Sequence, residues 1–241
     1  MDTKLEYLDD SYVKEFVSRV TLVKDQRFVI LDRTFFYPAS GGQACDHGKI
    51  TFESADGSKR IFSVLNVMKK DGLIFHEVDS PGLLDGMHVS CEIDWERRYR
   101  LMRSHTAAHI LSAVFHRETG AMITGNQLDI DQSRVDFSLE NFDKERVRYY
   151  FDIANEVIRS GLPISISYMK RHDVEKDAML CKLAKGLPEN ILELRIVSIG
   201  DFDRQADGGT HVKNTLEIGE IILTEMKNKG AENRRVYFKV V

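Results

Sequence analysis

The sequence predicts an α+β protein with two domains: a small N-terminal β-barrel over residues 1–94, and a two-layer α/β domain over residues 95–241. Short runs rich in Val, Ile and Phe fill the first part of the chain. Beyond about residue 94, runs of helical period alternate with strand-like runs. At 241 residues, of which 42% are hydrophobic, the chain is long enough to bury a core in each part.

The first domain is expected to consist of short strands joined by turns. The strand-like runs lie at residues 20–34, 48–54, 60–78 and 87–94. Lys69-Lys70-Asp71-Gly72, inside the third run, is typical of a hairpin turn. Several short strands with regular turns favour a barrel.

A glycine loop lies between the first two strand runs. The segment DRTFFYPASGGQACDHG, residues 32–48, reads as a strand end followed by this loop. Gly41 and Gly42 are predicted to hold Ser40 and Gln43 in a tight turn. On these residues alone, an ordinary surface turn is the favoured interpretation of the segment.

The second domain is predicted to open with a long helix. Neither Pro nor Gly lies between Trp95 and Glu118, apolar residues recur at intervals of three and four, and Gly120 supplies a stop. Strands are expected at residues 122–130, 133–139, 163–170, 192–200, 216–226 and 234–241, and further helices at 143–161 and 173–185. Helices against a mainly antiparallel sheet would form the two layers.

Two histidines on the long helix have the spacing of metal ligands. His105 and His109 are four residues apart, so both project from one face of a helix. His116 lies in nearly the same stripe, but it is roughly 10 Å along the axis from His109 and is not expected to share an ion. Two polar residues on a helix would give the same pattern, and a metal site needs further ligands from distant sequence.

Residues 201–219 supply candidates for those ligands. His211 follows Gly208-Gly209, and Asp207 lies four residues before it. Glycines permit positive φ and close backbone approach, so this turn is predicted to direct Asp207 and His211 toward one point. Three imidazoles and a carboxylate are an acceptable donor set for Zn²⁺, the predicted cofactor.

The charge distribution limits the possible partners. The net charge is −4, so no general basic field indicates a nucleic acid, and DNA is not an expected partner. An RNA contact must come from a local cluster, and Arg97, Arg98, Arg100 and Arg103 form one beside the paired histidines. A solvated helix face is the alternative interpretation of these four arginines.

Cysteine usage and hydropathy indicate a cytoplasmic protein. Cys45, Cys91 and Cys181 are odd in number and widely separated, which argues against a disulfide framework or a cysteine zinc cluster. Cys45 and Cys181 are interpreted as packing residues. With no apolar run of about 18 residues and no signal-peptide pattern, no membrane contact is expected.

Three separated segments together resemble the editing domain of alanyl-tRNA synthetase. Residues 94–111 resemble its HxxxH motif, residues 32–48 its SGGQxxDxG motif, and residues 204–219 its xGGTHVxNTxEIG motif. The chain lacks the synthetase's aminoacylation domain and is therefore similar to the free-standing trans-editing AlaX proteins of intermediate length.

The resemblance implies a hydrolase that cleaves the ester between serine and alanine tRNA, with glycine as a second candidate substrate. It implies zinc ligands at His105, His109 and His211. The fourth ligand, commonly Cys in a CGGTH motif, falls on Asp207 here, so Asp207 either ligates through oxygen or leaves an open position. Gln43 and Thr34 match the family's glycine-loop glutamine and preceding threonine, and the four arginines are plausible contacts to tRNA phosphates.

Several alternatives stay open at this point. The ion could activate a water and the ester or anchor the substrate amine, and no general base is identified. The similar editing domain of threonyl-tRNA synthetase shares the paired histidines, which leaves serine on threonine tRNA as a rival substrate. A binding module that holds tRNA without catalysis is a further alternative, suggested by Asp207 in place of Cys. The oligomeric state is left open.

Overall fold

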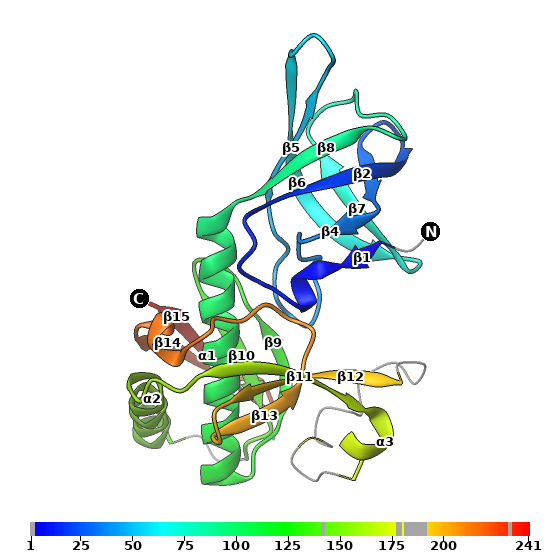
Figure 1. The fold of residues 1–241 in the computed structure, drawn as a ribbon. Coiled ribbons are helices and arrows are strands. Elements are labelled where there is room, and N and C mark those ends of the chain that lie inside the picture. Colours follow the sequence, from blue (N-terminus) through cyan, green and yellow to red (C-terminus); the bar gives the residue numbers. More distant parts are fainter. Residues whose placement is uncertain (1–2, 141–142, 177–179, 181–191, 231–232) are drawn as a thin grey trace. The chain divides into compact units, whose positions relative to one another are not determined.

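The computed structural model describes residues 3–140, 143–176, 180, 192–230 and 233–241 (Figure 1). By its internal contacts the chain divides into two compact units, Met1–Leu101 and Met102–Val241. The division falls inside the longest helix, α1 (Trp95–Thr119). The described chain combines a closed barrel with helices and open sheets, and this confirms the predicted α+β class.

Unit 1 is a closed six-stranded antiparallel barrel, as predicted. Its strands follow the order β2 (Glu15–Lys24), β3 (Phe28–Leu31), β7 (Leu73–Val78), β6 (Lys59–Lys70), β5 (Gly48–Glu53) and β8 (His88–Ile93). Side chains alternate between the interior and solvent, most regularly along β8, because successive residues of a strand point to opposite faces. The interior is filled by apolar side chains including Val20, Val29, Leu31, Ile50, Phe62, Val67 and Ile74.

Turn residues close the barrel as the sequence predicted. β6 and β7 are joined through Asp71 (φ 52°) and Gly72 (φ 81°), the backbone geometry of a tight hairpin. A short parallel pair, β1 (Lys4–Leu5) with β4 (Arg33–Thr34), and the 3₁₀ turn η1 (Glu6–Leu8) complete the unit. Arg33–Thr34 falls within the run predicted as strand at 20–34. β1 and η1 were not predicted, because two or three residues carry no periodicity.

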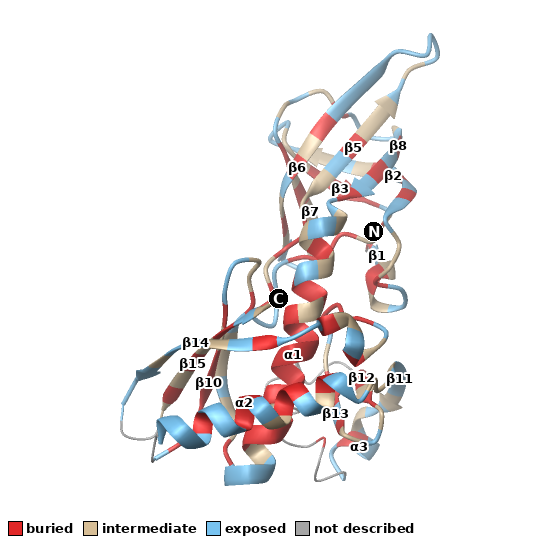
Figure 2. Cartoon of the chain, turned by 90° about the vertical axis from the view of Figure 1, so that its left-hand side faces the viewer, coloured by how far each residue is buried: buried red, intermediate tan, exposed pale blue. Residues whose placement is uncertain are grey.

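The middle of α1 is buried on all sides, which Figure 2 shows as a nearly continuous red stretch. Leu101, Ile110, Leu111 and Phe115 are all fully buried. The helix ends where the sequence predicted: Gly120 has φ 74° and its N–H donates to the carbonyl of His116 at 2.8 Å. Polar residues of this stretch are therefore surrounded by protein, which makes them candidates for a function.

The described part of unit 2 contains two antiparallel sheets and two α-helices besides α1. One sheet has the order β14 (Ile221–Asn228), β15 (Arg234–Val240), β10 (Ser133–Phe137), β9 (Ile123–Gln127), and the other β11 (Ile164–Lys170), β12 (Glu193–Ile199), β13 (Asp203–Ala206). α2 (Lys144–Arg159) begins after Asp143, whose side chain accepts the Glu145 N–H at 2.8 Å. The ring of Phe115 stacks on Phe137 with centroids 4.1 Å apart and meets Tyr150 of α2 edge-on, which joins the three elements in one core.

Three predictions for unit 2 need correction. The predicted strand at 216–226 begins instead as a 3₁₀ turn, η2 (Thr215–Ile218), because Asn214 and Glu217 form a capping box there. The predicted helix at 173–185 starts earlier, as α3 (Arg171–Val174), and residues 177–179 and 181–185 of it lie outside the described residues. β13 was not predicted at all.

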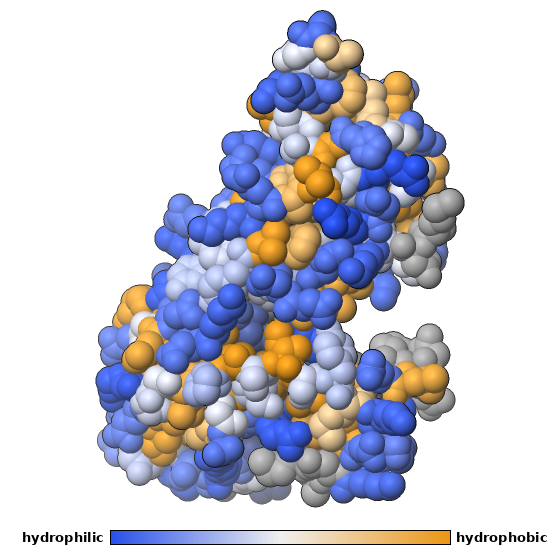
Figure 3. All heavy atoms as spheres, in the orientation of Figure 1, coloured by the Kyte–Doolittle hydropathy of each residue, from blue (hydrophilic) through white to orange (hydrophobic). Residues whose placement is uncertain are grey.

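Hydrophilic side chains predominate on the face drawn in Figure 3, with hydrophobic ones scattered among them. Large exposed apolar side chains are dispersed, for example Val17 and Ile61 on the barrel and Tyr149 on α2. Within the described residues, no helix is both long enough and apolar enough to cross a membrane.

Candidate metal centre

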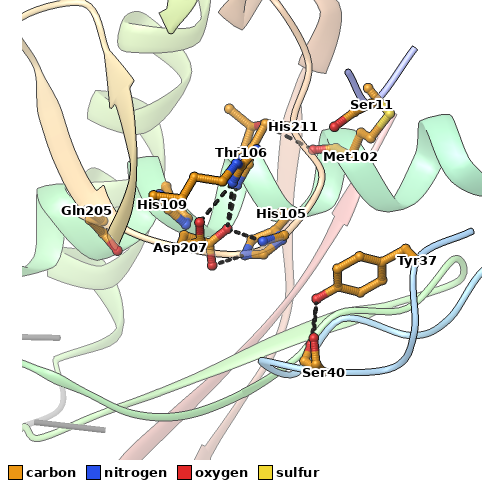
Figure 4. A network of polar contacts seen from close by, with 12 residues as sticks. Ser11, Tyr37, Ser40, Met102, His105, Thr106, His109, Gln205, Asp207 and His211 are labelled. Atoms are coloured by element: carbon orange, nitrogen blue, oxygen red, sulfur yellow. Dashed lines mark hydrogen bonds and ion pairs between the residues drawn. The ribbon is translucent and has the colours of Figure 1, made fainter. Parts of the chain in front are cut away.

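The three histidines and the aspartate predicted as metal ligands lie together in unit 2. His105 and His109 come from α1, and Asp207 and His211 from the loop after β13 (Figure 4). One nitrogen or oxygen atom from each residue lies within 4.8 Å of the others. The three imidazoles are 3–6% exposed, and their ring centroids are 4.5–5.2 Å apart. The fold therefore brings the four side chains to one buried point.

The strand β13 positions Asp207, which directly follows it, at this point. Asp203 and Gln205 are buried on one face of the strand and exposed Arg204 lies on the other. Asp207 continues the same alternation one residue past the strand's end, so it faces the same way as Asp203 and Gln205. The pattern DFDRQAD carries this period-two signal, but the strand is too short for it to stand out.

Position 209 requires a glycine because its backbone lies close to the His105 ring, and not because the turn needs a positive φ. A Cβ at Gly209 would lie 2.1 Å from Cε1 and 2.3 Å from Nδ1 of His105, whereas one at Gly208 would meet nothing within 4 Å. Neither residue has the left-handed φ that was expected from the Gly208-Gly209 pair. The loop passes so near α1 that only hydrogen fits between the backbone and the His105 ring.

Each ring nitrogen of His211 has one side-chain contact, Nδ1 with Thr106 and Nε2 with Asp207. The hydroxyl of Thr106 donates its proton to the Met102 carbonyl at 3.0 Å. In the tautomer that a metal ligand needs, His211 Nδ1, which is 3.1 Å from the same hydroxyl oxygen, carries the proton and donates to it. The lone pair of His211 Nε2 then faces Asp207 Oδ2 at 2.9 Å.

Two acceptors at that distance repel each other unless a positive charge lies between them. Asp207 Oδ2 also accepts the Gly209 N–H at 2.5 Å, as expected of an ionised carboxylate. Burial holds the pKa of His211 well below its usual range, and the adjacent His105 lowers it further. A metal cation would satisfy both atoms without protonating the imidazole.

The protonation states around the cluster suit a metal ion. Burial likewise lowers the pKa of His105 and of His109. Neutral imidazoles and an ionised carboxylate are the forms in which these side chains bind metal. Three nitrogen donors and one oxygen donor match the four-coordinate sites that Zn²⁺ prefers in proteins.

Thr34 and Gln43, the two residues predicted to contact substrate, belong to unit 1. Thr34 is 0% and Gln43 2% exposed. The Gly41-Gly42 turn is confirmed: Gln43 N donates to the Ser40 carbonyl at 2.9 Å, and both glycines have positive φ. The Tyr37 hydroxyl lies 2.8 Å from Ser40 Oγ and ties down this loop (Figure 4).

A buried histidine orients the Thr34 hydroxyl. Burial lowers the pKa of His76 to about 4, so the ring is neutral. His76 Nδ1 lies 3.0 Å from the Val29 carbonyl and must donate to it. Nε2, 2.9 Å from Thr34 Oγ1, is then an acceptor, so Thr34 donates its proton to His76. The Phe36 N–H donates to the same oxygen at 3.1 Å, which leaves one lone pair of the hydroxyl to accept.

The four arginines predicted to contact tRNA do not form one surface, and the structure corrects the prediction for Arg98. Its side chain is 0% exposed and pairs with Asp46, with Nε–Oδ1 at 2.9 Å, so it cannot reach a phosphate. Arg97 is half-buried and its Nε donates to the Cys45 carbonyl, while Arg100 is exposed and lies 3.4 Å from Glu96. In unit 2, half-buried Arg103 donates to the Ile218 and Val241 carbonyls. Neighbouring positions on a helix point in different directions, which a cluster read from the sequence overlooks.

The remaining candidate residues from the sequence lie outside the metal-ligand cluster or outside the described residues. Cys45 and Cys91 are buried and free, and Cys45 packs in the barrel core as predicted. Cys181 lies outside the described residues. His116 Nδ1 is 3.2 Å from the Ala121 carbonyl, and the residue is not part of the metal-ligand group. Thr106 and His76, which orient other side chains, were missed because nothing in their local sequence marks such a role.

Two family descriptions match parts of the chain. "Threonyl and Alanyl tRNA synthetase second additional domain" matches residues 194–237, which include Asp207 and His211. "tRNA synthetases class II (A)" matches residues 4–97. The chain is also 34% identical to an alanine–tRNA ligase of Pyrobaculum neutrophilum, over 93% of this chain but 25% of the ligase.

Shorter relatives match along their whole length. The alanyl-tRNA editing protein AlaX-M of Methanosarcina barkeri is 49% identical over 99% of both chains. The protein of the same name from Saccharolobus solfataricus is 43% identical over 97% of both chains. Because these identities extend over nearly the full length, the chain belongs to the AlaX-M family of alanyl-tRNA editing proteins.

Proposed function

We propose that this protein is an aminoacyl-tRNA deacylase that hydrolyses the ester between serine and alanine tRNA, acting in trans on the finished aminoacyl-tRNA. The observation that carries the proposal is the buried cluster of His105, His109, Asp207 and His211. Membership of the alanyl-tRNA editing family supports tRNA as the substrate class.

The choice of serine follows from what an alanine site can discriminate. A pocket that accepts alanine excludes an amino acid larger by one hydroxyl only modestly, so a second, hydrolytic site is required. Such a site selects serine when its own polar group would otherwise be left unpaired, and discrimination then reaches roughly 10⁴ to 10⁵. The buried Thr34 hydroxyl, whose proton is committed to His76, is suited to accept a hydrogen bond from the serine hydroxyl. Gln43 is the second proposed substrate contact.

The proposed metal ligands are the three imidazoles through nitrogen and Asp207 through oxygen. When bound, zinc would supply Lewis acidity toward the ester carbonyl or a water molecule. Thr106 holds His211 with its Nε2 lone pair directed at the centre, and the Gly209 N–H holds the Asp207 carboxylate. A carboxylate binds zinc less tightly than the thiolate usual at this position, so the site should exchange metal more readily.

The decisive experiment is deacylation of Ser-tRNA and Ala-tRNA, both on alanine tRNA, with bound zinc measured in parallel. We expect rapid hydrolysis of the serine ester, little hydrolysis of the alanine ester, and loss of activity and zinc in His105→Ala. Serine on threonine tRNA, tested alongside, should be a poor substrate. A folded, zinc-loaded protein that binds tRNA but releases no serine would contradict the proposal and favour a binding module.

Among the candidate arginines, we propose Arg100 as the phosphate contact. Its side chain is exposed, and Glu96, 3.4 Å away, is itself exposed, so the guanidinium is available at little cost. Arg100→Glu should weaken tRNA binding and reduce the salt dependence of log K by about one. Arg148→Glu on α2, an equal charge change at another exposed position, is the control. Equal losses in both variants would indicate a general charge effect and contradict the assignment.

A further inference from the structure

A second buried carboxylate, Asp203, faces the metal-ligand cluster from β13. Its side chain is 8% exposed, and Oδ2 lies 3.8 Å from Nδ1 of His109. Asp203 is not one of the four residues whose ligand atoms meet. Its position beside Nδ1 of His109 therefore needs a different explanation.

His109 supplies that explanation, because its Nδ1 is buried and has no hydrogen-bond partner among the residues that the structure describes. A buried polar atom without a partner is costly, so such an atom in a native protein usually marks a group that pairs in another state. If Nδ1 carried the lone pair, it would face a carboxylate oxygen and be repelled. If Nδ1 carries the proton, it needs only to move closer to Asp203 to form a charge-assisted hydrogen bond.

Asp203 is held in place for this role. Gln205 Nε2 donates to Asp203 Oδ2 at 2.8 Å, and both residues project from the same face of β13. The pairing of Asp203 with Ile199 and of Gln205 with Val197 anchors that strand to β12. The carboxylate is therefore fixed by backbone pairing and by a neighbouring amide, independently of His109.

We propose that Asp203 is a positioning residue that fixes the ligand tautomer of His109. The carboxylate would keep the proton on Nδ1 and so leave the Nε2 lone pair for the metal. Thr106 imposes the same tautomer on His211 from the other side of the cluster. Carboxylates and hydroxyls that hold ligating histidines in this way typically contribute 10–100-fold to metal affinity. The inference rests on the metal centre of the proposed function.

The surroundings of Asp203 set the expected size of the effect. Asp203 and Gln205 form part of the wall of a cavity of about 390 Å³, lined also by Phe202 and Met122. In an Asp203→Ala variant, water from this cavity could reach Nδ1 and replace part of the lost hydrogen bond. We therefore expect the lower end of the range, about a 10-fold loss of zinc affinity.

The test is a titration of the full-length protein with Zn²⁺ against a chromophoric chelator. Asp203→Ala should bind zinc about 10-fold more weakly than the wild type, and the isosteric Asp203→Asn, which keeps an acceptor without the charge, should fall between them. Asp201→Asn is the matched control, because Asp201 is exposed in the turn just before β13 and its charge change leaves the cluster intact. Side-chain ¹⁵N NMR of the zinc-loaded wild type should show His109 protonated at Nδ1.

The outcomes separate this inference from the proposed function. Zinc binding by the wild type with unchanged affinity in both Asp203 variants would overturn the role of Asp203 and leave the metal centre intact. So would a His109 that carries its proton on Nε2. Failure of the wild type to bind zinc would overturn the metal centre and, with it, the role of Asp203.

Discussion

Replacement of Arg98 by alanine should destabilise the barrel strongly, although the sequence assigned this residue to tRNA binding. The guanidinium donates to both oxygens of Asp46 and to the carbonyls of Ser11 and Phe35, all within unit 1. Both charged side chains are 0% exposed. Arg98→Ala therefore leaves a buried carboxylate without its counter-charge and two carbonyls without a donor.

The expected cost is large compared with the stability of a small domain. Removal of one partner of a buried ion pair typically costs about 3–5 kcal/mol, because the remaining charge is uncompensated. At a urea dependence of about 2 kcal/mol per molar, the unfolding midpoint should fall by about 1.5–2.5 M. The single tryptophan, Trp95, reports on this unit, since its ring stacks on Tyr99 in the first turns of α1.

The assay is urea unfolding followed by Trp95 fluorescence, with Arg100→Ala as the control. Arg100 is exposed and its contact with Glu96 should contribute under about 1 kcal/mol. Arg98→Met combined with Asp46→Leu should recover part of the loss, because no buried charge then remains, while the Ser11 and Phe35 carbonyls still lack a donor and the Tyr37 N–H loses its acceptor. A midpoint for Arg98→Ala within about 0.3 M of the wild type, accompanied by weaker tRNA binding, would refute the reasoning and restore the sequence-based assignment.

Three further predictions concern the metal centre and the barrel. Gly209→Ala should abolish zinc binding and activity, because its Cβ would lie 2.1 Å from the His105 ring, whereas Gly208→Ala should behave like the wild type; equal zinc content in the two variants would contradict the close approach. Asp207→Cys should raise zinc affinity, measured by chelator competition, because thiolate is the softer ligand; lower affinity would mean that the loop is shaped for the carboxylate. Folding lowers the pKa of buried His76 from 6.5 to about 4, so between these values the unfolded chain binds the additional proton and the free energy of unfolding decreases as pH falls. From pH 7 to pH 4 this decrease should amount to about 3 kcal/mol, and urea unfolding of His76→Gln should lack it; identical pH slopes in both proteins would contradict this account.

The barrel and the long helix could be predicted because their signals are local. Alternating apolar residues, the Asp71-Gly72 turn and the helical period that ends at Gly120 each depend on contiguous residues. The sequence also nominated His105, His109, Asp207 and His211, and the structure brings these four together. Residue type and spacing alone were enough to name the chemistry that such a cluster supports.

What only the tertiary structure decided is how each side chain is used. Arg98 and Arg100 are indistinguishable as sequence, yet one is buried against Asp46 and the other is exposed. The role of Gly209 follows from the distance between a loop and a helix more than a hundred positions apart in the chain. Likewise, the tautomer of His211 depends on Thr106, and the partner of His109 depends on the short strand β13. Burial and hydrogen bonding are set by contacts between distant segments, and local periodicity carries no record of which segments meet.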